Sequence, residues 1–134
     1  MDVETQLELM VPAAPTAARE ARRAVARHRF VGADQQPTLL LLVSELVSNC
    51  VRHAGLAENE RIRLRARRRD EDCAYVEVCD RGRSGRVPAK RAEGADALEP
   101  GGLGLVLVDE MADRWGVACN DGETCVWFEL ACAV

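Results

Sequence analysis

The sequence of residues 37–55 is PTLLLLVSELVSNCVRHAG, and the rest of the chain is best interpreted around it. Apolar side chains recur in it at intervals of three and four residues, which predicts one helix with a continuous apolar face. Pro37 suits the first helical position and Gly55 suits the stop. The apolar face comprises Leu39, Leu42, Val43, Leu46, Val47 and Cys50.

Polar side chains interrupt this otherwise core-like helix. Glu45, Asn49 and His53 follow one another at one-turn intervals, so they project from the same side. Burying a carboxylate and a carboxamide is costly unless a partner satisfies them. Two interpretations follow. These residues form the solvent-exposed edge of an ordinary amphipathic helix, or they face a polar ligand.

Length and composition limit the class of protein. The chain has 134 residues, which fits one domain, residues 1–134. Its net charge of −4 argues against a nucleic-acid-binding protein. The N-terminal segment MDVETQLELM lacks the basic and apolar regions of a signal peptide, and no apolar run is long enough to span a bilayer. We therefore expect a cytoplasmic protein without a membrane segment.

The six cysteines form no Cys-x-x-Cys pair, and no histidine lies at metal-ligand spacing from them. They are Cys50, Cys73, Cys79, Cys119, Cys125 and Cys132. Three of them, Cys50, Cys79 and Cys125, occur in apolar patterns. We therefore expect them to be small buried side chains in a reducing compartment.

The segments on either side of this helix predict an α+β, two-layer sandwich with a mostly antiparallel sheet and helices on one face. Alternating apolar and polar residues predict strands, and a three-to-four residue period predicts helices. The expected strands are residues 5–11, 61–68, 74–80, 117–119 and 124–130, and the other expected helices are 17–29 and 105–115. Asn120-Asp121-Gly122 should form the turn of the last hairpin.

Residues 81–101 have no regular period and are rich in Gly, Pro, Ser, Arg and Lys. A structureless segment of this length in a small domain is usually a functional lid or binding loop. A carboxylate and a glycine, Asp80 and Gly82, stand at its start, where they suit a hydrogen-bond donor on a flat ligand. Gly102 and Gly104 follow it and open a helix, whose free amide groups favour an anion.

Three segments resemble the sequence boxes of the GHKL ATPases, the superfamily of gyrase, sensor histidine kinases and MutL. Residues 45–54, ELVSNCVRHA, resemble the N box, and residues 76–82, VEVCDRG, resemble the G1 box. Residues 102–116, GLGLVLVDEMADRWG, resemble the G2 box, and Thr124 resembles the threonine of the last box. The resemblance covers nearly the whole chain and implies the Bergerat ATP-binding fold, with residues 81–101 as the ATP lid.

The resemblance implies that ATP and Mg²⁺ are the cofactors. Asn49 would ligate Mg²⁺, which keeps several waters and needs few protein ligands. Glu45 would act as the general base or orient the attacking hydroxyl, and Asp80 would bind the adenine amine. The full set implied to contact the nucleotide is Asn49, Arg52, His53, Asp80, Gly82, Gly102, Leu103, Gly104, Leu105 and Thr124.

Within this superfamily, a chain without a second domain resembles the RsbW-type anti-sigma factor serine/threonine kinases. That branch implies Mg²⁺-dependent phosphorylation of an anti-anti-sigma partner of the STAS type, and binding of a sigma factor. An alternative stays open: ATP sets the affinity for a protein partner without phosphoryl transfer. The resemblance also implies a homodimer, for which we expect the N-terminal strand and the first helix to supply the surface.

Overall fold

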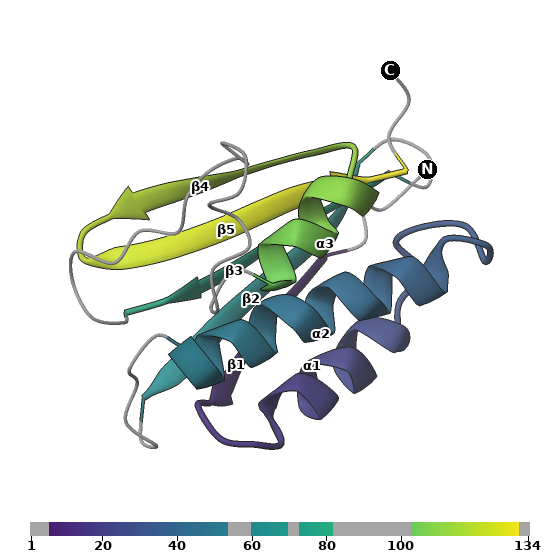
Figure 1. Ribbon diagram of the computed structural model, residues 1–134. Coiled ribbons are helices and arrows are strands. Elements are labelled where there is room, and N and C mark those ends of the chain that lie inside the picture. The colour runs from purple at the N-terminus through teal and green to yellow at the C-terminus, as the bar shows by residue number, and fades with distance from the viewer. Residues whose placement is uncertain (1–5, 54–59, 70–72, 82–102, 132–134) are drawn as a thin grey trace.

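A computed structural model of the chain describes residues 6–53, 60–69, 73–81 and 103–131. In this part of the chain, five antiparallel strands form one sheet in the order β1-β2-β3-β5-β4, and three helices cover one face of it (Figure 1). The elements are β1 (Gln6–Pro12), α1 (Ala17–Ala26), α2 (Gln36–His53), β2 (Arg61–Arg69), β3 (Cys73–Asp80), α3 (Leu103–Met111), β4 (Arg114–Asn120) and β5 (Glu123–Leu130). The predicted α+β two-layer sandwich is confirmed.

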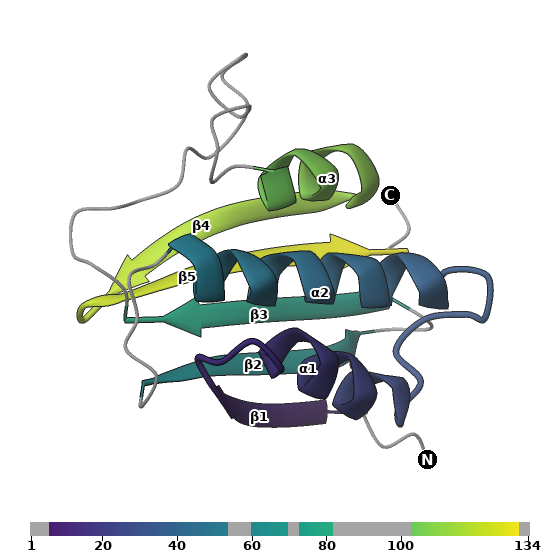
Figure 2. The same cartoon turned by 60° about the horizontal axis from the view of Figure 1, so that its bottom comes forward.

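Helix α2 lies over the middle of the sheet, with α1 and α3 on either side of it (Figure 2). Its apolar face forms the centre of the core: Leu39, Leu42, Val43 and Val47 are fully buried and Leu46 is 2% exposed. Each such side chain contributes roughly 1.5–3 kcal/mol by leaving water. This burial fixes which side of α2 meets the sheet, and therefore which side remains for polar residues.

The sheet has one covered face and one face on which no helix of the described residues lies, and we call the latter the open face. On β2, Ile62, Leu64 and Ala66 are buried beneath the helices, whereas the alternate positions are arginines. Neighbouring residues of a strand point to opposite faces, so these arginines lie on the open face. Side chains of the other strands that share this face include Glu8, Tyr75, Glu77, Cys79, Glu123, Cys125, Trp127 and Glu129.

The boundary between α3 and β4 differs from the prediction. The helix was expected over residues 105–115 and the strand from 117, but α3 ends at Met111 and β4 begins at Arg114. Trp115 therefore belongs to the strand, where it lies opposite Phe128, and its indole Nε1 donates to Asp109 Oδ1 over 2.7 Å. Tertiary packing of the indole has overridden the local helical period.

Gly116, which directly follows the expected helix 105–115, lies within strand β4. It lies opposite Trp127 in the β4–β5 ladder, and a Cβ atom at this position would come within 2.9 Å of the Trp127 indole. The glycine therefore makes room for Trp127 on the open face. The predicted hairpin turn is confirmed, with Asp121 at φ 52° and Gly122 at φ 80° between the two strands, as a two-residue type I′ turn requires.

Cys79 and Cys125 are buried, as expected, but they are not the reduced side chains that a reducing compartment implies. These residues lie directly opposite each other on β3 and β5 and form a disulfide, although 46 residues separate them in the sequence. Cys73 is also disulfide-bonded, whereas Cys50 and Cys119 are free. The pairing depends on the register of two distant strands, so the spacing of the cysteines did not reveal it.

Candidate functional site

The predicted site residues that the structure describes gather at one end of the sandwich. The C-terminal half of α2, the end of β3 and the start of β5 meet there, and α3 packs against α2 (Figures 1 and 2). Asp80, the last residue of β3, pairs with Thr124 near the start of β5. Because Val78, Val126 and Phe128 on the same strands alternate into the core, the side chains of Asp80 and Thr124 face the helices.

Asn49 carries an unusual polar atom. Its Oδ1 is buried and has no hydrogen-bond partner among the residues that the structure describes. A buried acceptor without a partner costs about 1–3 kcal/mol, so such atoms need an explanation. An amide oxygen is a ligand that Mg²⁺ accepts. The Asn49 side chain therefore fits a metal ligand, which the resemblance to the N box implies.

The other polar residues of α2 are arranged around Asn49. Glu45 lies one turn before it and is partly exposed, and Arg52 is exposed near the end of the helix. His53 is the last residue of α2, and its side chain lies outside the described part of the chain. Glu45 is thus accessible from the polar side of α2, as a general base must be.

Asp80 is connected to α2 by a contact that sequence reasoning missed. The thiol of Cys50 donates a hydrogen bond to Asp80 Oδ2 over 3.0 Å. Burial, and then the negative charge of Asp80 and this hydrogen bond, raise the pKa of the Cys50 thiol well above its usual value. Cys50 is therefore a neutral donor at neutral pH. No sequence signal indicated this role, because Cys50 simply continues the apolar face of α2.

Thr124 is half-buried on strand β5, opposite Asp80 of strand β3. Its Oγ1 is 3.9 Å from the Sγ of Cys119, its partner in the β4–β5 ladder. The carboxylate of Asp80 and the hydroxyl of Thr124 thus share one face of two adjacent strands. This arrangement offers an acceptor and a hydroxyl to the edge of a polar ligand.

The glycine segment before α3 is only partly described. Helix α3 begins at Leu103, which confirms that this segment opens a helix, and Gly104 belongs to its first turn. Leu105 is 4% exposed and packs in the core, so its side chain anchors the helix and does not face a ligand. Gly82, Gly102 and the predicted lid beyond Arg81 lie outside the described residues.

These features define a class: a two-layer α+β domain with a carboxylate at the end of a strand and, on the central helix, an amide oxygen that has no hydrogen-bond partner among the described residues. The family described as the histidine kinase-like ATPase domain matches residues 11–130. The chain therefore belongs to the histidine kinase-like ATPase family, and the predicted relationship to the GHKL ATPases is confirmed. Membership implies ATP binding, generally with Mg²⁺.

Solved structures add support for the fold. The crystal structure of the RsbU and RsbW domains of Rv1364c from Mycobacterium tuberculosis is similar, with a TM-score of 0.69 and 17% sequence identity. The similarity covers 94% of the present chain and 32% of that longer chain. No curated protein gave a significant match. Among the described residues, no helix is long and apolar enough to cross a membrane.

Proposed function

We propose that this chain is a cytoplasmic, ATP-binding anti-sigma factor with Mg²⁺-dependent serine/threonine kinase activity towards an anti-anti-sigma partner of the STAS type. In this proposal residues 1–134 form one ATPase domain, with residues 81–101 as its lid. The observation that carries it is the buried, unpartnered Oδ1 of Asn49, among the described residues, in a histidine kinase-like ATPase fold. The similarity to a structure that contains an RsbW domain supports the choice of branch.

The adenine end of the site is assigned to the paired ends of β3 and β5. Asp80 accepts a hydrogen bond from the adenine amine, and Thr124 supports the same edge of the base. Cys50 keeps the Asp80 carboxylate in place by donating to its Oδ2. Gly82 is the proposed residue that shapes the adenine pocket, because a glycine allows close approach of the backbone to a flat ligand.

The phosphate end is assigned to α2 and to the start of α3. Asn49 holds Mg²⁺, which when bound neutralises phosphate charge. Helix α3 begins at Leu103, and anions are favoured at a helix N-terminus. The amide groups of Gly102, Leu103, Gly104 and Leu105 are therefore the proposed phosphate contacts. Arg52 and His53 are the proposed neighbours of the phosphates, and the guanidinium of Arg52 would supply positive charge there.

Phosphoryl transfer needs a positioned hydroxyl more than covalent chemistry by the protein. Glu45, one turn before Asn49 and partly exposed, accepts the proton of the attacking serine or threonine hydroxyl or orients it. The hydroxyl comes from the protein partner.

A homodimer is part of the proposal, with β1 and α1 as its surface. Strand β1 is an edge of the sheet, and Met10 on it is 53% exposed. An exposed strand edge is a ready surface for pairing with another chain. Sedimentation of the wild-type protein measures its oligomeric state, and it tests the proposed homodimer separately from nucleotide binding.

Calorimetric titration of ATP, with and without Mg²⁺, tests the nucleotide site. We expect Mg²⁺-dependent binding by the wild-type protein, its loss in Asn49→Ala, and partial recovery in Asn49→Asp, which restores an oxygen ligand. Thr38→Ala, near the start of the same helix, is the matched control and should bind as the wild-type does. Absence of binding by the wild-type protein would reject the proposed function.

Phosphate transfer from ATP to a purified STAS-domain protein tests the activity. Incorporation into a serine or threonine of that protein supports the kinase. Partner binding that depends on ATP, without any incorporation, would instead establish the binding switch.

A further inference from the structure

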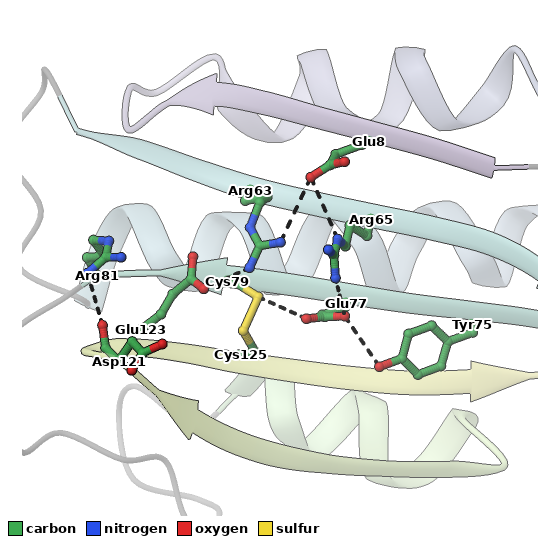
Figure 3. A network of polar contacts seen from close by, with 10 residues as sticks. All are labelled: Glu8, Arg63, Arg65, Tyr75, Glu77, Cys79, Arg81, Asp121, Glu123 and Cys125. Carbon is green, nitrogen blue, oxygen red and sulfur yellow. Dashed lines mark hydrogen bonds and ion pairs between the residues drawn. A yellow bond between two sulfur atoms is a disulfide. The ribbon is translucent and has the colours of Figure 1, made fainter.

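A disulfide joins the two strands that carry the proposed adenine contacts. Cys79 and Cys125 form one rung of the β3–β5 ladder, and Asp80 and Thr124 form the next rung. Since successive residues of a strand point to opposite faces, the disulfide lies on the open face and the Asp80–Thr124 pair lies beneath the helices. Figure 3 shows the disulfide within the polar network of the open face.

The disulfide holds these strand ends close together. The Cα atoms of Cys79 and Cys125 are 4.0 Å apart. Directly opposite residues of ordinary antiparallel strands have Cα atoms about 4.5 or 5.5 Å apart. Breaking the disulfide therefore allows the strands to separate at this rung, and the next rung, one residue away, carries Asp80 and Thr124.

We propose that the Cys79–Cys125 disulfide is a redox-controlled clamp on the nucleotide site, which binds ATP more tightly when the disulfide is formed than when it is reduced. The proposal rests on the proposed nucleotide-binding function. Its physical basis is preorganisation: the linked strands hold Asp80 and Thr124 at a fixed separation, whereas unlinked strands lose conformational freedom when ATP binds.

The chemistry is thiol–disulfide exchange with a dithiol reductant. A thiolate of the reductant attacks one sulfur and forms a mixed disulfide, and the other cysteine leaves as a thiolate. The second thiol of the reductant then attacks the mixed disulfide and releases the second cysteine. The two cysteines gain two electrons and two protons, and the reductant becomes a disulfide.

The surroundings suit both redox states. Glu77 Oε2 lies 3.3 Å from Cys79 Sγ, so the carboxylate can accept a hydrogen bond from the thiol after reduction. The Arg65 guanidinium, 3.8 Å from Glu77, balances the negative charge of that carboxylate. Cys125 is 5% exposed and Cys79 is 1% exposed, so Cys125 is the sulfur that a reductant reaches first.

The proposed location also favours a regulatory disulfide. Structural disulfides are rare in the cytosol, and those that form there are usually transient, catalytic or redox-sensing. A disulfide next to a ligand contact connects the redox state of the compartment to the affinity for that ligand.

The test is a titration of Mg·ATP into the oxidised protein and into protein reduced with dithiothreitol. We expect roughly tenfold weaker binding after reduction, as the loss of preorganisation predicts. The Cys79→Ala/Cys125→Ala double variant should match the reduced wild-type protein and should not respond to dithiothreitol. Equal affinity of the two wild-type forms, or tighter binding by the reduced form, would overturn the proposal.

Two controls isolate this disulfide. Cys73 is also disulfide-bonded, so Cys73→Ala must keep the full response to dithiothreitol; loss of the response would assign it to the other disulfide and reject the clamp. Buffers are freed of transition metals, because side-chain ligand atoms of Glu77, Cys79 and Cys125 lie within 4.8 Å of one another. A reduced pair with such a neighbour can bind a thiophilic cation.

Amide hydrogen exchange without ATP separates failure of the clamp from failure of the proposed function. We expect reduction to accelerate exchange at Asp80 and Thr124 but not at Val76 and Phe128, in the middle of the same strand pair. If neither redox form binds ATP, the proposed function fails. In that case accelerated exchange at the Asp80–Thr124 rung supports the clamp, and unchanged exchange there rejects it.

Discussion

The thiol of Cys50 donates a hydrogen bond to the carboxylate of Asp80 over 3.0 Å and thereby connects the central helix to the end of strand β3. The contact unites two sequence segments that carry different parts of the proposed site: Cys50 directly follows Asn49, and Asp80 is the proposed adenine contact. The position of α2 is thus coupled to the orientation of Asp80. This contact, the proposed general base and the packing of the sheet can each be tested.

Removing the Cys50 thiol should weaken ATP binding. Cys50→Ala deletes the hydrogen-bond donor that holds the Asp80 carboxylate. A hydrogen bond to a charged group typically contributes about 1.5–3 kcal/mol of free energy to the structure that contains it. Cys50→Ser keeps a donor and should lose less affinity. Calorimetric dissociation constants of the three proteins check this order, and equal affinity of Cys50→Ala and the wild-type protein would contradict it.

Stability should fall at alkaline pH because of the same thiol. The pKa of Cys50 is raised in the folded state, so above the ordinary thiol pKa of about 8.5 the folded protein holds a proton that the unfolded chain releases. The stabilisation is therefore complete below that pH and is lost as pH rises towards the folded pKa. Urea unfolding from about pH 7 to 10 should show a steeper decline for the wild-type protein than for Cys50→Ala. Parallel curves would refute the assignment.

Iodoacetamide should distinguish Cys50 from Cys119, the free cysteines of the described residues. Cys119 is exposed, whereas Cys50 is partly buried and its raised pKa keeps it protonated. Because the thiolate is the reactive form, we expect alkylation at about pH 8 to reach Cys119 well before Cys50. Peptide mass spectrometry at several reaction times measures the order. Faster labelling of Cys50 would show that its contact with Asp80 is not kept in solution.

Glu45→Gln should abolish phosphoryl transfer and leave ATP binding intact. The amide cannot accept the hydroxyl proton, and general-base catalysis typically contributes about 10²–10⁴-fold. Transfer to the STAS-domain partner and calorimetric ATP binding are measured on the same preparation. Unchanged transfer would remove Glu45 from the catalytic role, whereas loss of both transfer and ATP binding would indicate a structural role.

Gly116→Ala should destabilise the sheet without involving the nucleotide. The added methyl group would lie 2.9 Å from Trp127 Nε1, and overpacking of this kind typically costs about 1–3 kcal/mol. Urea denaturation measures the loss. The Gly116→Ala/Trp127→Leu pair is the control, because a smaller side chain at position 127 should tolerate the methyl group. If the alanine costs as much in the Trp127→Leu background as in the wild-type protein, the indole is not the cause.

Some of the candidate site could be predicted from the sequence. The order of the three boxes placed Asn49 on the central helix, Asp80 at a strand end and Gly104 at the start of a helix, and the structure has each of them there. Their roles in nucleotide binding stay predictions. The contact of Cys50 with Asp80 could not be predicted, because an apolar-looking cysteine carries no signal of the strand that it faces.

The two layers of this protein are already encoded in its local sequence patterns. The three-to-four period of residues 37–55 and the alternation in residues 61–68 depend only on which side chains each segment turns towards the core, and this property is local. Which distant residues meet is a property of the folded chain. The register of β3 against β5 pairs Asp80 with Thr124 and Cys79 with Cys125, and the Trp127 indole determines what position 116 accommodates. These choices depend on strand order and packing between remote segments, which no local period encodes.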